Sequence, residues 1–417
     1  MSRLNKELGL LQGIALLSTS LLGTGIFAVP ALAATAAGAA SLWAWLILIV
    51  LVLPVAFTFA QLGRRFPHAG GAPHLIGRAF GARLERLVAF MFLAVLPVGL
   101  PAALQIATGF WQALWPLGRG EILVIQLASL AAMLALGQRP ARASGIVQGL
   151  IALAILASVA LIWWAGDLPR TDHPLLPPPG EGWERIPAAL AVMFWCFVGI
   201  EAFTHLGEEF RRPQRDFPLA LLLGVLLAGL VYWACSVAVL SFDAYGDAQR
   251  NATSLPWLLE NLLGPQAKVL IAVVGYLACF ASMNVYVQGF ARLIWSLADE
   301  GKLPAALARR NRHGMPGPAL LLVVLACALC AIGAAVLQLS TDELIRYANG
   351  NFVLVYLLSM AAGVVLLRGV WRIVAAAASL LCAAVLAMLG VDAFYALGLL
   401  AVLALLDAGR RHCRAAA

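Results

Sequence analysis

The chain has 417 residues, of which 63% are hydrophobic and 12% are charged, and its formal net charge is +8. Soluble globular domains carry about 25% charged residues, so this composition excludes a protein whose whole surface faces water. Apolar stretches of roughly 20 residues, the length that crosses a bilayer, recur along the chain with short polar interruptions. The composition therefore predicts an all-α polytopic membrane protein in which residues 1–417 form a single membrane domain.

The pattern of apolar stretches predicts twelve transmembrane helices. The first stretch is too long for the apolar region of a signal peptide and lacks a cleavage site, so we interpret it as the first membrane helix. A short surface helix is expected over residues 251–263. The predicted spans are 10–37, 42–63, 84–113, 121–137, 145–166, 187–207, 218–241, 268–297, 318–337, 343–366, 371–390 and 392–408.

The distribution of basic residues predicts how the chain is oriented. With the N-terminus in the cytoplasm, 21 of the 28 lysines and arginines fall in inner segments, 6 fall in outer segments, and Arg292 lies inside a helix. This distribution follows the positive-inside rule. We therefore expect a multi-pass protein of a bacterial inner (cytoplasmic) membrane with both termini in the cytoplasm, and no nucleic acid partner.

The first and sixth predicted spans contain glycine at mid-depth, where an unbroken helix is the default. The first has Gly23 and Gly25, with Pro30 just beyond, and the sixth has Gly199 followed by Glu201. Unwound backbone in hydrocarbon is tolerated only where protein, water or a ligand satisfies its N–H and C=O groups, so a cavity is expected at this depth. Freed N–H groups attract a carboxylate and freed C=O groups attract an ammonium, and an α-amino acid carries both.

The alternative is that these glycines serve only close helix packing, as small residues do in membranes. Breaks five helices apart are what two inverted five-helix repeats produce. On that interpretation residues 10–166 form the first repeat, residues 187–366 form the second, and residues 371–408 form two additional helices. The repeat is not visible in residue identity and depends on the positions of the two breaks.

Several short motifs lie at fixed places relative to these spans. Residues 23–27 (GTGIF) lie in the first span and residues 195–201 (WCFVGIE) in the sixth. Residues 66–71 (FPHAGG), 208–218 (EEFRRPQRDFP) and 299–304 (DEGKLP) follow spans two, six and eight. In these motifs the chain resembles the amino acid-polyamine-organocation transporters over nearly its full length.

The resemblance implies a LeuT-type fold and secondary active transport by alternating access. Residues 17–25, 98–107 and 275–282 are similar to members that export methionine and branched-chain amino acids, which implies efflux of methionine, leucine, isoleucine and valine driven by the proton-motive force. An apolar predicted lining without a dedicated acid also favours neutral apolar substrates. Import or exchange on the same fold, and sensing without transport, stay open.

The backbone argument and the resemblance together predict the substrate-binding residues. The first break is expected to bind the substrate carboxylate, and the sixth to offer carbonyl groups to the ammonium and apolar surface to the side chain. Trp195 resembles an aromatic gate in relatives that exchange cationic amino acids, with packing as the alternative. The predicted residues are Ser20, Leu22, Gly23, Thr24, Gly25, Ile26, Gln105, Phe194, Trp195, Cys196, Phe197, Met283 and Asn349.

Two ionisable residues of the sixth span are predicted to couple transport to protons. Glu201 is the acid placed deepest in a span, and an intramembrane acid indicates function because its charge is costly there. His205 follows one turn later on the same helix face and titrates near neutrality. The alternatives are that Glu201 only holds helices together and that His205 lies at the cytoplasmic rim.

The sequence predicts no enzyme, no cofactor and no metal site. Glu201 and His205 lack a third ligand, and no nucleophile stands at a recognisable spacing from a base. Cys327 and Cys330 form a C-x-x-C pair in a buried helix without a second ligand pair, which favours packing. The expected partners are small neutral amino acids, protons and the lipid bilayer, and the oligomeric state is not readable from the sequence.

Overall fold

The computed structural model describes residues 5–23, 25–170, 176–247, 250–251, 254–339, 341–388 and 393–415. These residues form helices joined by loops, and an isolated β-bridge joins Leu8 to Phe210. Eight helical segments among them are long and apolar enough to cross a membrane, and shorter apolar helices accompany these segments. The prediction of an all-helical polytopic membrane protein is confirmed.

Within the described residues every predicted span contains α-helix, and the short helix predicted over 251–263 is present as α13. The helices are α1 (Leu10–Leu22), α2 (Val29–Ala37), α3 (Ser41–Arg65), α4 (Gly71–Phe80), α5 (Ala82–Leu93), α6 (Leu96–Gln112), α7 (Arg119–Gly137), α8 (Ala141–Ala165), α9 (Ile186–Met193), α10 (Ile200–Thr204), α11 (Asp216–Ser241), α13 (Ser254–Leu263), α14 (Ala267–Asp299), α15 (Gly317–Leu337), α16 (Thr341–Leu366), α17 (Val370–Met388) and α18 (Ala393–Ala415).

The third predicted span, 84–113, coincides with one apolar segment of membrane-spanning length, Ala82–Gln112, in which a short turn separates two helices. α5 ends at Leu93 and α6 begins at Leu96. Pro97 lies in the first turn of α6. In a continuous helix its ring would clash with the carbonyl group of Leu93, four residues earlier. The proline therefore explains the turn between α5 and α6.

The sequence did not predict α4. This helix has 10 residues, which rise about 15 Å, roughly half the thickness of the hydrocarbon core. It ends at Gly81, whose φ of +94° is a conformation that favours glycine. α4 is therefore too short to span a membrane and connects α3 to α5.

The predicted interruption of the first span is present. α1 ends at Leu22, turns follow over residues 25–28, and α2 begins at Val29. The N–H groups of Gly23 and Ile26 still donate to carbonyl oxygens four residues earlier, at 3.1 and 3.0 Å. The interruption is therefore a local unwinding and not an extended loop.

The predicted interruption of the sixth span is also present. α9 ends at Met193, a 3-10 turn covers Phe194–Phe197, and α10 begins at Ile200. Gly199 has a φ of +132°, which L side chains rarely adopt. A Cβ atom built at Gly199 would lie 3.1 Å from Ser20 Oγ, so the second interruption lies directly against the end of α1.

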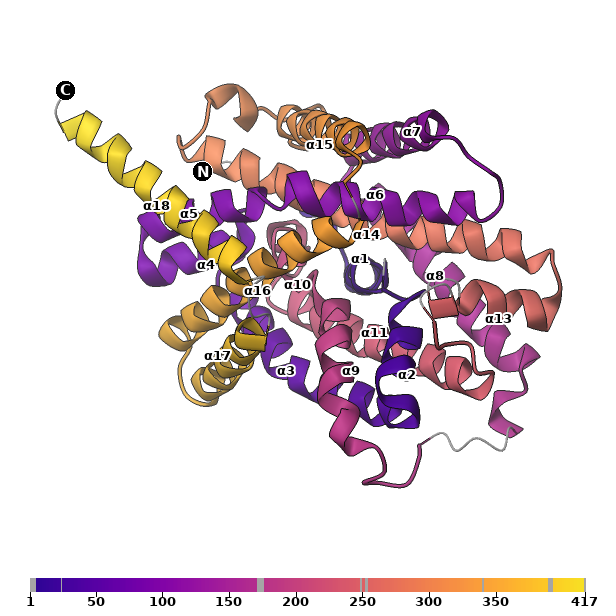
Figure 1. Ribbon diagram of the computed structural model, residues 1–417. Helices are drawn as coiled ribbons and strands as arrows, with labels where there is room; N and C mark the ends of the chain where they lie inside the picture. The colour runs from indigo at the N-terminus through magenta and orange to yellow at the C-terminus, as the bar shows by residue number, and fades with distance from the viewer. Residues whose placement is uncertain are drawn as a thin grey trace.

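α1 lies near the middle of the helix bundle, in contact with α8, α11 and α14 (Figure 1). The Thr19 hydroxyl of α1 donates a hydrogen bond to Gln148 Oε1 of α8 at 2.5 Å. Gln148 Nε2 in turn donates to the carbonyl oxygen of Ala281 in α14 at 2.9 Å. Interhelical hydrogen bonds of this kind hold membrane helices together, and these two fix α1 beside its neighbours.

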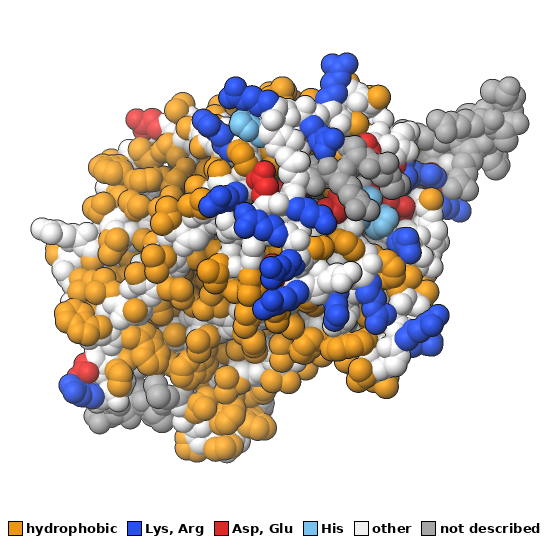
Figure 2. Space-filling view, turned by 180° about the vertical axis from the view of Figure 1, so that it is seen from behind, with side chains coloured by type: hydrophobic (Ala, Val, Ile, Leu, Met, Phe, Trp, Pro, Cys, Tyr) orange, Lys and Arg blue, Asp and Glu red, His pale blue; other side chains and the backbone are white. Residues whose placement is uncertain are grey.

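The surface of the molecule divides into a basic part and an apolar part. Figure 2 shows lysine and arginine side chains gathered over one side, whereas hydrophobic side chains cover most of the remaining face. Large apolar side chains are exposed there and elsewhere, for example Val124 and Leu337 at 65% and 70% exposure. Because soluble proteins do not expose apolar surface of this extent, the apolar part faces lipid.

A buried ion pair joins three segments at one end of the bundle. Glu209 and Arg292 are each 1% exposed, and the guanidinium group donates to both carboxylate oxygens. The backbone N–H groups of Glu7 and Leu8 donate to the Glu209 carbonyl oxygen at 2.8 and 2.9 Å. Glu209 therefore links three segments, because its carbonyl group binds the N-terminal segment and its carboxylate binds α14.

Replacing Arg292 tests how much this ion pair contributes. Arg292→Met leaves the Glu209 carboxylate buried without its partner, so we expect a loss of about 3–5 kcal/mol of stability. Arg185→Met is the matched control, because Arg185 pairs with Glu184 at 66% and 70% exposure, and its effect should stay within about 0.5 kcal/mol. Unfolding of the purified proteins in detergent measures both, and equal stabilities would contradict the prediction.

Candidate functional site

A cavity of about 70 Å³ lies where the two interrupted segments meet. One buried water needs about 10–15 Å³ on the same measure, so the cavity has room for a small organic molecule. The last turn of α1 contributes Ser20 and Leu21 to its wall, and the two interruptions contribute Gly25 and Val198. The other wall residues are Val95, Gly99, Leu100, Ala103, Ser282, Met283, Tyr286, Phe290 and Phe352.

Helix periodicity explains which residues of α6 and α14 reach this cavity. Gly99 and Ala103 are four residues apart in α6, and Ser282, Tyr286 and Phe290 follow the same spacing in α14. Residues four apart lie on one face of a helix. Most wall residues are apolar and a few are polar, a composition typical of small-molecule sites.

Side-chain hydroxyl groups satisfy the carbonyl groups at the end of α1. The Tyr232 hydroxyl of α11 donates to the Leu21 carbonyl oxygen at 2.9 Å, and Ser282 Oγ donates to the Ser20 carbonyl oxygen at 2.9 Å. Tyr232 reaches this position because Gly25 has no side chain, since a Cβ atom there would collide with the hydroxyl group. Two neighbouring helices therefore stabilise the first interruption.

Tyr356 of α16 stabilises the second interruption as both donor and acceptor. Its hydroxyl donates to the Phe197 carbonyl oxygen at 3.0 Å and accepts from the N–H groups of Gly199 and Ile200, both at 3.2 Å. One hydroxyl group thus satisfies the backbone on both sides of the break. A phenylalanine here would leave these polar groups without that partner.

Glu201 is fully buried in the first turn of α10. Its Oε2 accepts the N–H of Gly199 at 2.9 Å, and its Oε1 accepts the hydroxyl of Tyr286 at 2.8 Å. The ion pairs found among the described residues do not include Glu201. Since Tyr286 is part of the cavity wall, one hydroxyl group separates the acid from the cavity.

His205 follows α10 and is also fully buried, not at a solvated rim. Its Nδ1 lies 2.9 Å from the Ala69 carbonyl oxygen, and its ring stacks on Phe92 at 5.5 Å. Its Nε2 has no hydrogen-bond partner in the described part of the chain. The described contacts of Glu201 and His205 lead to different groups, so a proton relay through both residues stays a prediction.

Three predicted substrate-binding residues, Ser20, Gly25 and Met283, line the cavity. Ser20 Oγ is buried and has no hydrogen-bond partner among the residues that the structure describes. A buried hydroxyl group without a partner costs free energy, and a bound ligand would supply one. Ser20 is therefore the polar side chain of the wall best placed to contact a ligand.

Other predicted residues lie beside the interruptions, outside the cavity wall. Gly23 lies against Ser282, where a Cβ atom would be 2.8 Å from Ser282 Oγ. Phe197 packs near Tyr232, with ring centres 6.5 Å apart. Those buried near the breaks without lining the cavity are Leu22, Gly23, Ile26, Cys196 and Phe197. Outside the described residues fall Thr24 and the side chains of Phe194, Trp195 and Asn349.

The structure contradicts the placement of Gln105 in this cavity. Gln105 follows Ala103 by two residues, which turns it about 200° around the helix, so it lies on the opposite face of α6. Its Nε2 donates to the Leu339 carbonyl oxygen at 3.3 Å, and its side chain lines a second cavity. The prediction had used the depth of the residue in the span and not the helix face.

Sequence reasoning missed much of the wall. The four-residue spacing in α6 and α14 is the signal that could have identified these positions. No local signal marks Tyr232, whose partner is the backbone of another helix. The missed wall residues are Leu21, Val95, Gly99, Leu100, Ala103, Val198, Tyr286, Phe290 and Phe352, and Tyr232 was missed beside the wall.

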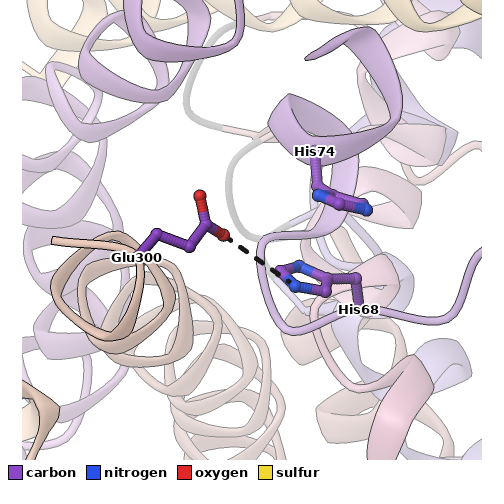
Figure 3. Close-up of side chains that lie close together, drawn as sticks. All are labelled: His68, His74 and Glu300. Atoms are coloured by element: carbon purple, nitrogen blue, oxygen red, sulfur yellow. Dashed lines mark ion pairs between the residues drawn. The ribbon is translucent and has the colours of Figure 1, made fainter. Parts of the chain in front are cut away.

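A second cluster of ionisable side chains brings together His68, His74 and Glu300 (Figure 3). One potential ligand atom from each lies within 4.8 Å of the others. Figure 3 shows the Glu300 carboxylate directed at the His68 ring, with the His74 ring lying over it. The two imidazole rings are stacked at 3.7 Å with their planes 16° apart.

The contacts of this cluster fit an ion pair between Glu300 and Lys302 beside a neutral histidine better than they fit a metal ion. His68 Nδ1 accepts the N–H of Gly70 at 3.0 Å, so the ring proton is on Nε2, the atom that faces Glu300 at 3.9 Å. Burial, and secondarily the neighbouring His74, lowers the pKa of His68 to about 4, which keeps the ring neutral near pH 7. The Lys302 ammonium pairs with Glu300. Because a metal ligand needs a free lone pair, this donor set is a poor fit.

Replacing Tyr356 tests whether its hydroxyl maintains the site. Tyr356→Phe removes the partner of three backbone groups, so we expect a loss of about 1–3 kcal/mol of stability and a clear loss of leucine binding. Tyr276→Phe is the matched control, because it removes a single hydroxyl contact to Ser129, at 2.6 Å and outside the cavity wall. Titration of leucine into both purified variants compares them, and equal affinities would count against the assigned role.

Comparison of the sequence with known proteins identifies the family of this chain. The amino acid permease family matches residues 8–406. The chain is 52% identical to the L-methionine/branched-chain amino acid exporter YjeH of Escherichia coli (strain K12), over 97% of each chain. It is 27% identical to the uncharacterized amino acid permease YecA of Bacillus subtilis (strain 168), over 87% of this chain and 86% of that one. It is 26% identical to the cadaverine/lysine antiporter of Escherichia coli (strain K12), over 76% and 72%. The chain belongs to the amino acid permease family.

Proposed function

We propose that the protein exports neutral apolar amino acids, namely methionine, leucine, isoleucine and valine, by proton-coupled alternating access. The observation that carries this proposal is the cavity between the two interrupted segments, whose wall is apolar apart from a few hydroxyl and peptide groups. The name of the relative that is 52% identical, an exporter of L-methionine and branched-chain amino acids, supports the same substrates. The protein is a transporter and not an enzyme, as its family membership shows.

The cavity offers separate surfaces to the two parts of such a substrate. Backbone of the first interruption, with Ser20 and Gly25, would contact the carboxylate, and carbonyl groups of the sixth span would contact the ammonium. Leu100, Met283 and Phe290 would pack against the apolar side chain. The remaining predicted residues of the two breaks, from Leu22 to Ile26 and from Phe194 to Phe197, would act through their backbone.

The composition of the wall favours neutral substrates with modest selectivity among them. Among the described residues that line the cavity, none carries a formal charge, so a cationic side chain would have no counter-ion. One methylene group in an apolar pocket is worth about 1–3 kcal/mol. Discrimination among leucine, isoleucine, valine and methionine would therefore be poor, at most about 10–200-fold.

The same proposal includes a LeuT-type arrangement of twelve spans. Residues 10–166 and 187–366 would form inverted repeats and residues 371–408 two additional helices, and both termini would lie in the cytoplasm of a bacterium. Interruptions in the first and sixth predicted spans support the repeats. The gathering of basic side chains on one side of the molecule (Figure 2) supports the orientation.

Glu201 is the residue that we assign to proton coupling. A carboxylate buried in a membrane protein without a cationic partner is costly, and this cost favours exchange of a proton during the cycle. Its bond with the Tyr286 hydroxyl at 2.8 Å connects it to the cavity wall. His205, whose Nε2 lacks a partner among the described residues, would be a second proton-accepting group.

Counterflow in proteoliposomes tests the function. Labelled leucine and methionine should exchange across the membrane, and labelled lysine should not. With an imposed pH gradient, proton antiport accumulates leucine in the more acidic compartment, whereas symport accumulates it in the more alkaline one. Binding of leucine without any movement across the membrane would contradict transport, and accumulation on the alkaline side would contradict antiport.

Glu201→Gln separates coupling from binding, since it keeps the size of the side chain and a carbonyl acceptor but cannot titrate. For exchange of one proton per substrate, a gradient of one pH unit drives about tenfold accumulation, equal to 1.4 kcal/mol. We expect the variant to lose this accumulation and to retain leucine counterflow. The control is Glu121→Gln, because the Glu121 carboxylate also accepts a backbone N–H, at 2.7 Å, outside the cavity wall. Unchanged accumulation by Glu201→Gln would remove this residue from the proton path.

A further inference from the structure

A second cavity, of about 210 Å³, lies between α6, α7 and α15, on the face of α6 opposite the substrate site. Its polar wall residues are Gln105, Arg119, Gln126 and Gln338. Its apolar wall residues are Pro101, Ile122, Leu123, Ala331, Ala334, Ala335 and Leu339. The cavity is thus amphipathic, and the transport function does not use it.

Gln126 is the unusual residue of this wall. It is 5% exposed, and its side chain makes no hydrogen bond with any described residue, although it faces the cavity. Its amide group is open to the cavity, because the fully buried polar atoms without a partner do not include it. The neighbouring Gln105 differs, because its Nε2 donates to Leu339. The amide of Gln126 therefore indicates that this cavity receives a ligand with a hydrogen-bond acceptor.

Arg119 supplies a positive charge at the mouth of the cavity. It is the first residue of α7, it is exposed, and its guanidinium belongs to none of the ion pairs among the described residues. Gln126 lies seven residues further along α7, which is about 10 Å deeper at 1.5 Å per residue. The cavity therefore presents a cation at its mouth and an amide at depth.

The surroundings of the cavity indicate the kind of molecule that enters it. α7 and α15 both qualify as membrane spans and are among those whose apolar surface is least covered by protein. Val124 on α7 is 65% exposed, and Val336 and Leu337 on α15 are 73% and 70% exposed. Because these side chains face hydrocarbon, the molecules that reach the cavity are those of the bilayer.

We propose that this cavity binds one anionic phospholipid. Its phosphate pairs with Arg119, an ester carbonyl accepts a hydrogen bond from the Gln126 amide, and an acyl chain packs against Leu123, Ala331 and Ala334. This order matches the lipid, in which ester carbonyls lie between the phosphate and the acyl chains. Basic pockets between membrane helices bind anionic headgroups in the same manner. With the orientation proposed above, the lipid belongs to the outer leaflet.

The test titrates lipids into the purified, delipidated full-length protein and counts bound lipids by native mass spectrometry. The probes are dioleoylphosphatidylglycerol, which is anionic, and dioleoylphosphatidylcholine, which is zwitterionic and has the same ester groups. We expect the anionic lipid to bind about tenfold more tightly, because in phosphatidylcholine the choline cation offsets the phosphate charge that faces Arg119. Equal affinities for the two lipids would overturn the proposal.

Two variants separate the two contacts. Arg119→Gln should remove the preference for phosphatidylglycerol and weaken phosphatidylcholine less, because both lipids carry the phosphate but the choline group of phosphatidylcholine offsets its charge. Gln126→Leu should weaken both lipids by a similar factor, because the ester carbonyl is common to them. The matched controls are Arg185→Gln and Gln112→Leu, which replace exposed residues outside the cavity and should bind both lipids as the parent protein does. If Arg119→Gln or Gln126→Leu binds both lipids as the parent protein does, the assignment of that contact is overturned.

The unfolding temperature of each lipid-free variant shows whether it still folds. Gln126→Leu should unfold at the same temperature as the parent or higher, since it replaces an unpaired buried amide by an apolar group of similar size. Ala334→Leu, which fills the cavity, should abolish binding of both lipids independently. Inorganic phosphate and leucine are also added separately, without lipid. If either raises the unfolding temperature of the parent protein and Arg119→Gln removes this effect, the cavity is a small-anion or amino acid site and the lipid assignment is overturned.

Discussion

A peptide group that leaves a helix inside a membrane must find a partner, because no water replaces the lost hydrogen bond. In this protein the partners are hydroxyl groups on three surrounding helices, Tyr232 on α11, Ser282 on α14 and Tyr356 on α16. These contacts allow two spans to unwind at the same depth. They also fix α1 and α10 against the helices that form the rest of the cavity wall. The site therefore exists because tertiary contacts, and not local propensity, satisfy its backbone.

The same packing gives α6 two functional faces. Gly99 and Ala103 face the substrate cavity, whereas Pro101 and Gln105 face the cavity next to α7 and α15. A helix with 3.6 residues per turn separates positions two apart by about 200°, so a single turn of α6 contributes to both. A shift of α6 during a transport cycle would change both cavities together. The proposed lipid site thus shares α6 with the proposed substrate site but has different wall residues.

Much of the fold was predictable from the sequence, and the site was predictable only in part. Apolar length and mid-depth glycine are local properties, so the spans and both interruptions could be predicted. α4 and the turn between α5 and α6 were missed, because a 10-residue helix and a turn at Pro97 leave the apolar pattern almost unchanged. Wall residues depend on which helix face meets which neighbour, and Gln105 shows that depth in a span does not determine this. Partners such as Tyr232 contact backbone 211 residues away in sequence, a distance that no local motif encodes.

Glu201 accepts a hydrogen bond from the backbone at the break of the sixth predicted span. An interrupted helix offers N–H groups to an anion, yet here the Gly199 N–H at the start of α10 is bonded to the Glu201 carboxylate and to the Tyr356 hydroxyl. The protein's own acid therefore takes the place that a substrate carboxylate would otherwise occupy at this break. The first interruption, with Ser20 and Gly25 close to the cavity, is the break to which we assign the substrate carboxylate in the proposed function. Protonation of Glu201 would weaken its bond to Gly199 and change the geometry of the break itself. In the proposed function, a proton on Glu201 and the substrate would then act on neighbouring interruptions of one cavity, and this proximity would couple their binding.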